Sequence, residues 1–244
     1  MLLSIITINF NNLIGLQRTY DSVVCQSFMD YEWIIIDGGS TDGSTDYITK
    51  IARDIHANPF LSYWCSEPDK GIYDALNKGV THCHGKYVSC MNAGDCFYDS
   101  ETLSRVFHSN RNADVLYGDA LFVEDDKGKS AMKLFPKKLT LNWLYHHSLN
   151  HQATFVKRNL LEKYRFDEKY HIMADRKLWL QFYLDHCSFQ YLNQPIARYD
   201  KTGISSRNGE LWIDELKQVR KEVLPGILIR SRVARKIYSF MFGV

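Results

Sequence analysis

The stretch YEWIIIDGGSTDGSTDYI, residues 31–48, predicts a buried β-strand that ends in a polar turn and continues into a helix. Residues 31–37 are rich in β-forming side chains, and the apolar run stops at Asp37. Two glycines then allow close approach of the backbone to a neighbouring group. Residues 40–42 are good N-caps for a helix that we expect to reach about Asp54. The pattern suits an ordinary strand–turn–helix connection as well as a ligand site, and it has neither dinucleotide-fold nor P-loop glycine spacing.

The alternation of strand and helix repeats as far as residue 91. Strands linked by helices at this pace run parallel with right-handed crossovers. The sequence therefore predicts an α/β fold with a mostly parallel central sheet flanked by helices. The further strands that we expect here are residues 2–8, 60–66 and 86–91, and the further helices are residues 13–26 and 72–83.

Polar loops follow the expected strands, and in parallel sheets ligands bind beyond the carboxyl ends of the strands. These loops should therefore meet at one crevice. They are residues 9–12, 37–42, 67–71 and 92–96.

The alternation becomes less regular after residue 97. We expect a helix near 100–109, a strand at 114–123, a hairpin turn at 124–129, a strand at 151–158 and an amphipathic helix at 173–185.

Composition sets broad limits on what the chain can be. With 244 residues and 45% hydrophobic content, it suits one large domain or a domain with an elaborated tail. A net charge of +2 gives no indication of a nucleic-acid partner. The first residues, MLLSIITINFNN, resemble a buried strand and not a signal peptide, and no apolar run is long enough for a transmembrane helix. We therefore expect six reduced cysteines and a cytoplasmic protein.

Four segments resemble the successive motifs of glycosyltransferase family 2, especially members from bacterial polysaccharide gene clusters. They are SIITINFNN (4–12), IIIDGGSTDGS (34–44), SEPDKGIYDALNKGV (66–80) and MNAGD (91–95). The resemblance extends from residue 3 to about residue 205, and the third segment is its most specific part. It implies a Rossmann-like GT-A domain over residues 1–208, with a nucleotide sugar as donor.

The resemblance also implies residues that bind the nucleotide, usually a uridine diphosphate. Asp37 would accept the N3–H of uracil. The family usually has two aspartates at this point, and Gly38 replaces the second one here. The expected nucleotide-binding residues are Thr7, Asn9, Asn11, Asp37, Gly39, Asp69 and Lys70.

The block at 66–79 places charged residues in a loop and on one helix. Gly71 opens that helix, and helix N-terminal amides attract anions. Asp69 could instead simply cap the helix, and Asp74 and Lys78 could form an ordinary i, i+4 surface pair. Contacts with nucleotide or sugar hydroxyls are open to Asp69, Asp74 and Asn77, and contacts with phosphate to Lys70 and Lys78.

MNAGD occupies the place of the family's metal-binding D-x-D motif and keeps one carboxylate, Asp95. A hard ion such as Mn²⁺ or Mg²⁺ prefers oxygen ligands and tolerates diphosphate as a co-ligand. Asn92 could add an amide oxygen, and metal-free catalysis is the alternative. The histidines and cysteines between His82 and Cys96 suggest zinc at first sight, but their spacing contains no C-x-x-C pair.

The segment HIMADRKLWLQF, residues 171–182, resembles the family's acceptor-side motif. It implies that Asp175 is the catalytic base, because an ionised carboxylate can take the proton of an attacking hydroxyl. Asp175 could instead be a helix N-terminal carboxylate that the dipole favours. The segment LNHQATFVKR, with His151 and Gln152, resembles the H-Q-x-x-F segment of close relatives, although a histidine on a strand is often simply hydrogen-bonded in the core. The expected sugar-side residues are Asp74, Asn92, His151 and Gln152.

The end of the chain shows two further features. Residues 197–206 resemble a family loop that closes over the diphosphate, in which Lys201, Ser205 and Arg207 could serve. Residues 209–244 predict a helical C-terminal extension, divided at Pro225–Gly226. Its second half is basic and aromatic, so it could lie on an anionic membrane, dock on the domain, or contact a second subunit in a homodimer.

The sequence thus favours an inverting hexosyl- or N-acetylhexosaminyl-transferase of surface polysaccharide biosynthesis. The donor would be a UDP-sugar and the acceptor a glycan or a lipid-linked saccharide. A catalytically inactive nucleotide-sugar-binding protein is the alternative, since the metal motif is depleted. A nucleotidyltransferase would need a basic loop after the first strand, which NFNNLIG does not supply. The inner face of the plasma membrane is the second location that this function suggests.

Overall fold

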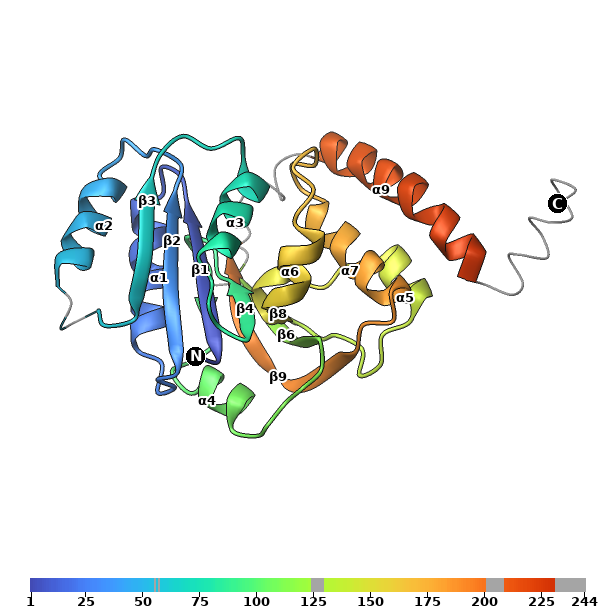
Figure 1. The fold of residues 1–244 in the computed structure, drawn as a ribbon, viewed down its shortest axis with the longest axis horizontal. Helices are drawn as coiled ribbons and strands as arrows, with labels where there is room; N and C mark the ends of the chain where they lie inside the picture. The colour runs from blue at the N-terminus through green and yellow to red at the C-terminus, as the bar shows by residue number, and fades with distance from the viewer. Residues whose placement is uncertain (55, 57, 124–129, 201–208, 231–244) are drawn as a thin grey trace, which may run out of the picture.

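The computed structural model describes residues 1–54, 56, 58–123, 130–200 and 209–230. Four parallel strands form the first half of the sheet, in the order β3-β2-β1-β4. Helix α3 covers one face of this half and α1 the other (Figure 1). The bounds are β1 Leu3–Asn9, α1 Leu13–Val24, β2 Tyr31–Asp37, α2 Ser44–Arg53, β3 Leu61–Ser66, α3 Ile72–Thr81 and β4 Tyr87–Cys90.

The second half of the sheet is mixed and continues in the order β8-β6-β9-β5, with β7 paired to β6. Strands β8, β7 and β5 pair antiparallel with their neighbours, whereas β6 and β9 run parallel. The bounds are β5 Cys96–Phe97, α4 Thr102–Phe107, β6 Val115–Val123, β7 Ser130–Lys133, α5 Leu141–His146, η1 His151–Ala153, β8 Thr154–Lys157, α6 Arg158–Tyr164, α7 Ala174–Leu184, β9 Phe189–Asp200 and α9 Gly209–Arg230.

The predicted α/β fold with helices flanking a central sheet is confirmed, and most predicted elements lie within two residues of their observed bounds. The sheet is parallel in its first half, as predicted, but mixed in its second half. The expected strand at 151–158 is partly wrong, because residues 151–153 form a short 3₁₀ turn before β8. The expected caps of α2 are also wrong. Asp42 turns its carboxylate to the amides of Leu13 and Ser44, and Gly43 takes the N-cap position. The hairpin turn at 124–129 and the loop residues Lys201, Ser205 and Arg207 lie outside the described residues.

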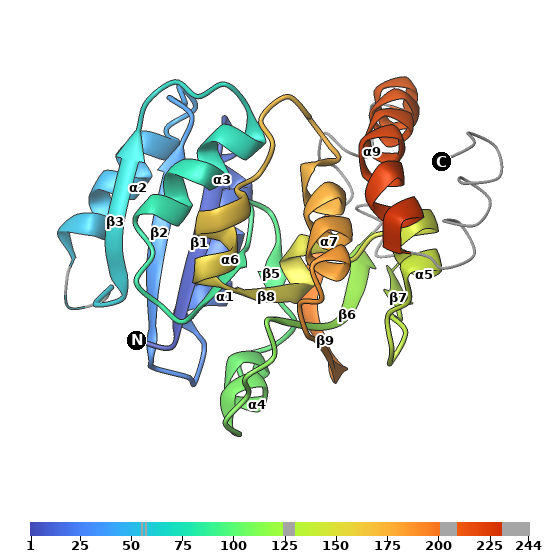
Figure 2. The same ribbon diagram turned by 45° about the vertical axis from the view of Figure 1, so that its right-hand side comes forward.

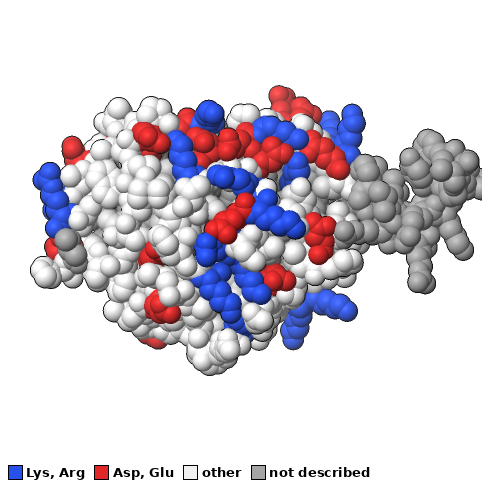
Figure 3. Space-filling view, in the orientation of Figure 1, with Lys and Arg blue, Asp and Glu red and all other residues white. Residues whose placement is uncertain are grey.

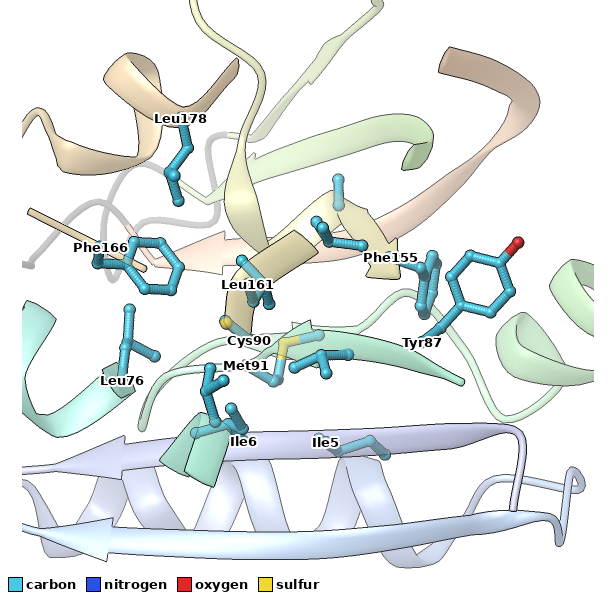
Figure 4. Packing of buried hydrophobic residues seen from close by; sticks show 14 of the residues in the cluster. Ile5, Ile6, Leu76, Tyr87, Cys90, Met91, Phe155, Leu161, Phe166 and Leu178 are labelled. Carbon is cyan, nitrogen blue, oxygen red and sulfur yellow. The ribbon is translucent and has the colours of Figure 1, made fainter. Parts of the chain in front are cut away.

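The buried core joins both halves of the sheet to the helices above it. Figure 4 shows Ile5 and Ile6 of β1 below, with Phe155 of β8 and Leu161 of α6 packed above them. These side chains are at most 2% exposed. Because one core spans both halves, the polar ends of β1, β4 and β8 are held in fixed positions relative to α7.

The glycines after β2 let two loops cross at short distance. Gly39 has φ +80, and a Cβ atom there would lie 3.3 Å from the backbone nitrogen of Pro68. A side chain would therefore be strained by its conformation and crowded by the 67–71 loop. The turn after Asp37 thus brings the loop that precedes α3 against the loop that follows β2.

Helix α9 packs on α7 and continues as one backbone helix through Pro225–Gly226, so the predicted division there is wrong (Figures 1 and 2). A proline inside a helix removes one hydrogen bond and its ring crowds the carbonyl four residues earlier, but its fixed φ of about −65° is compatible with helical backbone. Glu222 of α9 pairs with Lys169 and Lys177, in a region where basic and acidic side chains are interspersed (Figure 3). Burial alone would raise the pKa of Glu222, but hydrogen bonds from the two lysines lower it to about 2.

None of the helices that the structure describes combines the length and apolar character needed to cross a membrane.

Candidate active site

A cleft of about 890 Å³ opens at the carboxyl ends of the parallel strands. Loops 9–12, 67–71 and 92–96 all contribute to its lining, which confirms their predicted convergence. Loop 37–42 contributes none of the lining residues and lies behind loop 9–12. The opposite wall comes from the second half of the chain, namely from Lys133, residues 146–152, residues 171–173, Asp175, Arg176, Tyr199 and Trp212.

Asp37 is a fully buried hydrogen-bond hub at the end of β2. Its two oxygens accept five hydrogen bonds, from Asn9 Nδ2, Ser40 N, Ser40 Oγ, Thr45 Oγ1 and Ser66 Oγ, at 2.6–3.3 Å. Burial alone would raise the pKa of Asp37, but these bonds outweigh it and hold the pKa below its usual value. Direct contact with a nucleotide base stays a prediction, and it would have to displace one of the five donors.

Three other residues expected at the nucleotide are also engaged within the protein. Thr7 is buried and its hydroxyl accepts a hydrogen bond from the Trp33 indole at 2.9 Å. Asn9 lines the cleft, but its amide nitrogen is bonded to Asp37. Asn11 lines the cleft in a left-handed conformation and accepts the backbone N–H of Thr41 at 2.8 Å. These contacts tie the β1 and β2 loops together beneath the ligand space.

Gly38 leaves a space that two cleft residues border. A Cβ atom at Gly38 would lie 2.7 Å from Oδ2 of Asp69 and 3.1 Å from the ring of Phe10. The Asp69 carboxylate therefore lies where a side chain at position 38 would begin. Phe10 is 65% exposed although it is a large apolar residue. Phe10 was not predicted as a site residue, and the signal that could have revealed it is an aromatic ring between two polar residues after a buried strand.

The charged residues of the 66–79 block divide into two groups. Asp69 lines the cleft and accepts the N–H of Gly71, the N-cap residue of α3, at 2.8 Å, so it fixes the turn before α3 and faces the ligand space without capping the helix amides. Asp74 instead accepts the backbone N–H of Lys70 and pairs with Lys78 at 3.4 Å, the ordinary surface pair considered as the alternative. Neither Lys70 nor Asp74 is among the residues that line the cleft.

Asn77 is structural. It is buried, exchanges hydrogen bonds with the backbone of Phe166 at 2.8 and 2.9 Å and is not among the residues that line the cleft.

The loop after β4 is fixed by Thr19 of α1, whose hydroxyl donates to the carbonyl of Asp95 and accepts the N–H of Gly94. Asp95 lines the cleft, and its carboxylate accepts Gln152 Nε2 at 2.9 Å. Asn92 lines the cleft beside it, and its buried Oδ1 meets no donor among the described residues. This loop thus presents one carboxylate and one free amide oxygen.

A divalent ion would need help from a ligand at this loop. In the part of the chain that the structure describes, no three histidine, cysteine or acidic side chains gather as a metal site. Asp95 and Asn92 Oδ1 nevertheless fit Mn²⁺ or Mg²⁺ if diphosphate oxygens and water complete the coordination. For zinc, burial raises the pKa of Cys83 to about 12, which favours the protonated thiol over the thiolate that zinc binds.

Asp175 stands in the first turn of α7 and is 15% exposed. One oxygen accepts the N–H of Arg176 at 2.6 Å, and the other lies 3.4 Å from Nδ1 of His151. Arg176 is buried beneath the cleft and donates to the carbonyl of Tyr145 at 2.7 Å. Burial, and next the charge of Arg220, lower the pKa of Arg176 to about 10.

Glu215 of α9 fixes the start of α7, a role that the sequence gave no means to see. It is 6% exposed, and its oxygens accept the backbone N–H groups of His171, Ile172 and Met173 at 2.6–3.1 Å. These are the amides that precede the helix bearing Asp175. Trp212, one turn earlier on α9, lines the cleft. Because the partners lie more than forty residues apart, no local pattern connects them.

We expect Glu215→Gln to destabilise the fold by about 2 kcal/mol, because an amide cannot accept all three N–H groups and leaves buried donors unpaired. Thermal or urea unfolding measures the change. Asp214→Asn is the matched control on the same helix, since its pair with Lys217 is exposed and contributes little. Equal midpoints for the two variants would show that Glu215 does not hold the helix.

Comparison with known proteins agrees with this geometry. The family model for glycosyl transferase family 2 matches residues 4–173. An uncharacterised glycosyltransferase of Mycobacterium tuberculosis is 30% identical over 210 residues, which cover 83% of this chain and 76% of that protein. A PGL/p-HBAD biosynthesis glycosyltransferase of Mycobacterium bovis is 26% identical over 206 residues, covering 82% and 77%.

Solved structures show the same fold. S. aureus TarS 1-349 in complex with UDP-GlcNAc has a TM-score of 0.72 at 17% identity, covering 95% of this chain and 68% of that one. A longer TarS chain is covered to 40%. The mannosyltransferase PcManGT from Pyrobaculum calidifontis, in complex with GDP-Man and Mn²⁺, has a TM-score of 0.63 at 15% identity, covering 92% and 68%. The chain therefore has the GT-A fold and belongs to glycosyltransferase family 2.

Proposed function

We propose that the chain is an inverting glycosyltransferase that moves a sugar from a UDP-sugar to a hydroxyl of a glycan or lipid-linked saccharide in surface polysaccharide biosynthesis. The observation that carries the proposal is one cleft with two unlike walls. The wall of the parallel strands offers Phe10, Asp69 and the start of α3. The opposite wall offers Asp175. A donor on the first wall would point its sugar at the carboxylate on the second.

The base of the donor would lie beside Gly38. Phe10 offers an exposed ring for stacking, and the Asp69 carboxylate can accept the N3–H of uracil. Asp37 would then act from behind, by holding the loops of Asn9 and Ser40 in place. In this arrangement the uracil contacts Asp69, whose carboxylate faces the cleft, and not Asp37, whose carboxylate is surrounded by protein donors.

The diphosphate would lie between α3 and the loop after β4. Gly71, Ile72 and Tyr73 line the cleft at the N-terminus of α3, where backbone amides favour negative charge. Asp95 and Asn92 would hold Mn²⁺ or Mg²⁺ against the phosphate oxygens. When bound, such an ion offsets the charge that builds up on the departing diphosphate.

Asp175 would act as the general base. The acceptor O–H bond breaks as its oxygen attacks the anomeric carbon, and the proton moves to Asp175. The bond from the anomeric carbon to the diphosphate breaks on the opposite face, so the configuration inverts. TarS is known in complex with UDP-GlcNAc and PcManGT in complex with GDP-Man, which supports a nucleotide sugar as the substrate of this fold.

The competing proposal is a nucleotide-sugar-binding protein without activity, favoured by the single carboxylate of the metal loop. A donor screen separates the two. Nucleotide release from UDP-glucose, UDP-GlcNAc and GDP-mannose is followed with soluble and lipid-linked acceptors, with Mn²⁺ and with chelator. We expect acceptor-dependent release from a UDP-sugar, reduced by chelator. Tight nucleotide binding without release under any condition would favour the inactive protein.

We expect Asp69→Asn to weaken UDP binding about 10-fold, which corresponds to about 1.4 kcal/mol. If the asparagine oxygen keeps the Gly71 N–H, its NH₂ group faces the base and cannot accept the N3–H of uracil. Isothermal titration calorimetry measures the dissociation constant. Glu67→Gln is the matched control two residues away, since Glu67 is exposed and pairs with Lys78 outside the cleft. Equal affinities for both variants would contradict the assignment of Asp69.

Membrane contact, a homodimer and a location at the inner face of the plasma membrane remain proposals. They depend on the basic, aromatic end of the chain, of which residues 231–244 lie outside the described structure. A separate function of the C-terminal extension, residues 209–244, is likewise a proposal, although its helix α9 packs on α7. A lipid-linked acceptor would suit a protein that associates with a membrane surface.

A further inference from the structure

The structure assigns to His151 a positioning role: it orients the Asp175 carboxylate, and the Asn92 amide holds the ring from the opposite side. This inference rests on the proposed function, in which Asp175 is the base. It is based on three side chains from different parts of the fold that contact one another in a row. Asn92 Nδ2 lies 3.1 Å from His151 Nε2, and His151 Nδ1 lies 3.4 Å from Asp175 Oδ2.

Asn92 and Asp175 face opposite nitrogens of the His151 ring. A carboxylate oxygen accepts a hydrogen bond, so Nδ1, which faces Asp175, is the donor in that contact. The Asn92 amide faces the other ring nitrogen, Nε2, at 3.1 Å and holds the ring from that side.

His151 itself is unsuited to be the base. Both ring nitrogens are engaged, one by Asn92 and the other by Asp175, so neither is free for the acceptor hydroxyl. The ring is also only 17% exposed. It is therefore a positioning residue, and the proton of the acceptor goes to Asp175.

The carboxylate of Asp175 is consequently held at both oxygens. Arg176 N–H binds Oδ1 from the start of α7, and His151 Nδ1–H approaches Oδ2 from the 3₁₀ turn on the same wall of the cleft. Two donors from different elements fix the plane of the carboxylate, and its remaining lone pairs are available to the cleft. A base held in this way keeps the short, aligned contact with the attacking hydroxyl that proton transfer needs.

Gln152, the residue after His151, holds a second carboxylate, that of Asp95. Gln152 Nε2 donates to Asp95 Oδ2 at 2.9 Å, and the turn is closed by the Thr154 hydroxyl on the carbonyl of His151 at 2.8 Å. One 3₁₀ turn thus holds the carboxylate of the acceptor side and the carboxylate of the diphosphate side. The His-Gln pair fixes the distance between the two ends of the reaction.

The test compares His151→Leu with His151→Asn in steady-state kinetics. Leucine fills similar space but donates nothing. Asparagine places an N–H donor near the position of Nδ1 and can still bind Asp175. We expect His151→Leu to lower kcat about 10- to 100-fold with the KM for the donor little changed, and His151→Asn to recover most of the rate. UDP binding and the unfolding midpoint, measured on each variant, show that the fold is retained.

A double substitution with Asp175→Asn distinguishes the two proposals. If His151 acts through Asp175, adding His151→Leu to Asp175→Asn lowers the residual rate no further. An unchanged kcat in His151→Leu, or His151→Asn as slow as His151→Leu with the fold intact, would overturn the positioning role. Full activity of Asp175→Asn would overturn the assigned base, and with it the proposed mechanism.

Discussion

Asp175→Asn is expected to lower the rate of sugar transfer about 1,000-fold, because general base catalysis typically contributes factors of 100 to 10,000. An asparagine keeps the size of the side chain and can still accept the N–H of Arg176, but it cannot take a proton from the acceptor. Nucleotide release in the presence of acceptor measures the rate. UDP affinity should stay within about 2-fold, since Asp175 lies on the wall opposite the proposed nucleotide contacts.

The matched control is Asp167→Asn, a carboxylate ahead of α7 that pairs with Lys177 and Lys169 and does not line the cleft. It is expected to affect stability more than turnover. A rate for Asp175→Asn within a factor of about 3 of the wild type, with the fold intact, would remove Asp175 as the base.

Asp37→Asn is expected to destabilise the protein by about 3 to 4 kcal/mol, the largest loss of stability that we predict for one side chain. The carboxylate is fully buried and accepts five hydrogen bonds. In asparagine the NH₂ group replaces one of the two accepting oxygens, so it faces N–H and O–H donors with which it cannot form a hydrogen bond. Urea unfolding at neutral pH measures the difference. The neighbouring Asp46→Asn is the control, since Asp46 is exposed on α2.

The same substitution has a defined pH dependence. The pKa of Asp37 in the folded protein is lowered from 3.8, so its ionisation stabilises the fold above that value and this contribution is lost as the pH falls through the folded-state pKa. The gap in stability between wild type and Asp37→Asn should therefore narrow only below about pH 4. A gap that narrows between pH 8 and pH 5 would show that another group is responsible.

Much of the fold could be predicted because its signals are local. The apolar run that ends at Asp37 defined β2 to the residue, and the polar loops after β1, β3 and β4 do meet at one cleft. Parallel strands leave little choice about where their carboxyl ends lie. Motif position alone points to Asp69, Asp95, His151 and Asp175, and the structure brings these four residues to the same cleft.

The rest depends on contacts between distant segments. The sequence places Asp37 at the cleft edge, but it does not reveal that Ser66 and Thr45 close over its oxygens. Glu215 carries no motif, and its role appears only when α9 packs against α7. The local pattern predicts His151 on a strand, yet a 3₁₀ turn directs its ring toward Asp175. Tertiary contacts, and not local propensity, decide these three positions.

The most direct test of the central claim is a crystal structure of the protein with uridine diphosphate and Mn²⁺. We predict the uracil beside Phe10, Gly38 and Asp69, the diphosphate between the start of α3 and Asp95, and open space between its terminal phosphate and Asp175. A nucleotide bound outside this cleft, or one whose terminal phosphate points away from Asp175, would contradict the account.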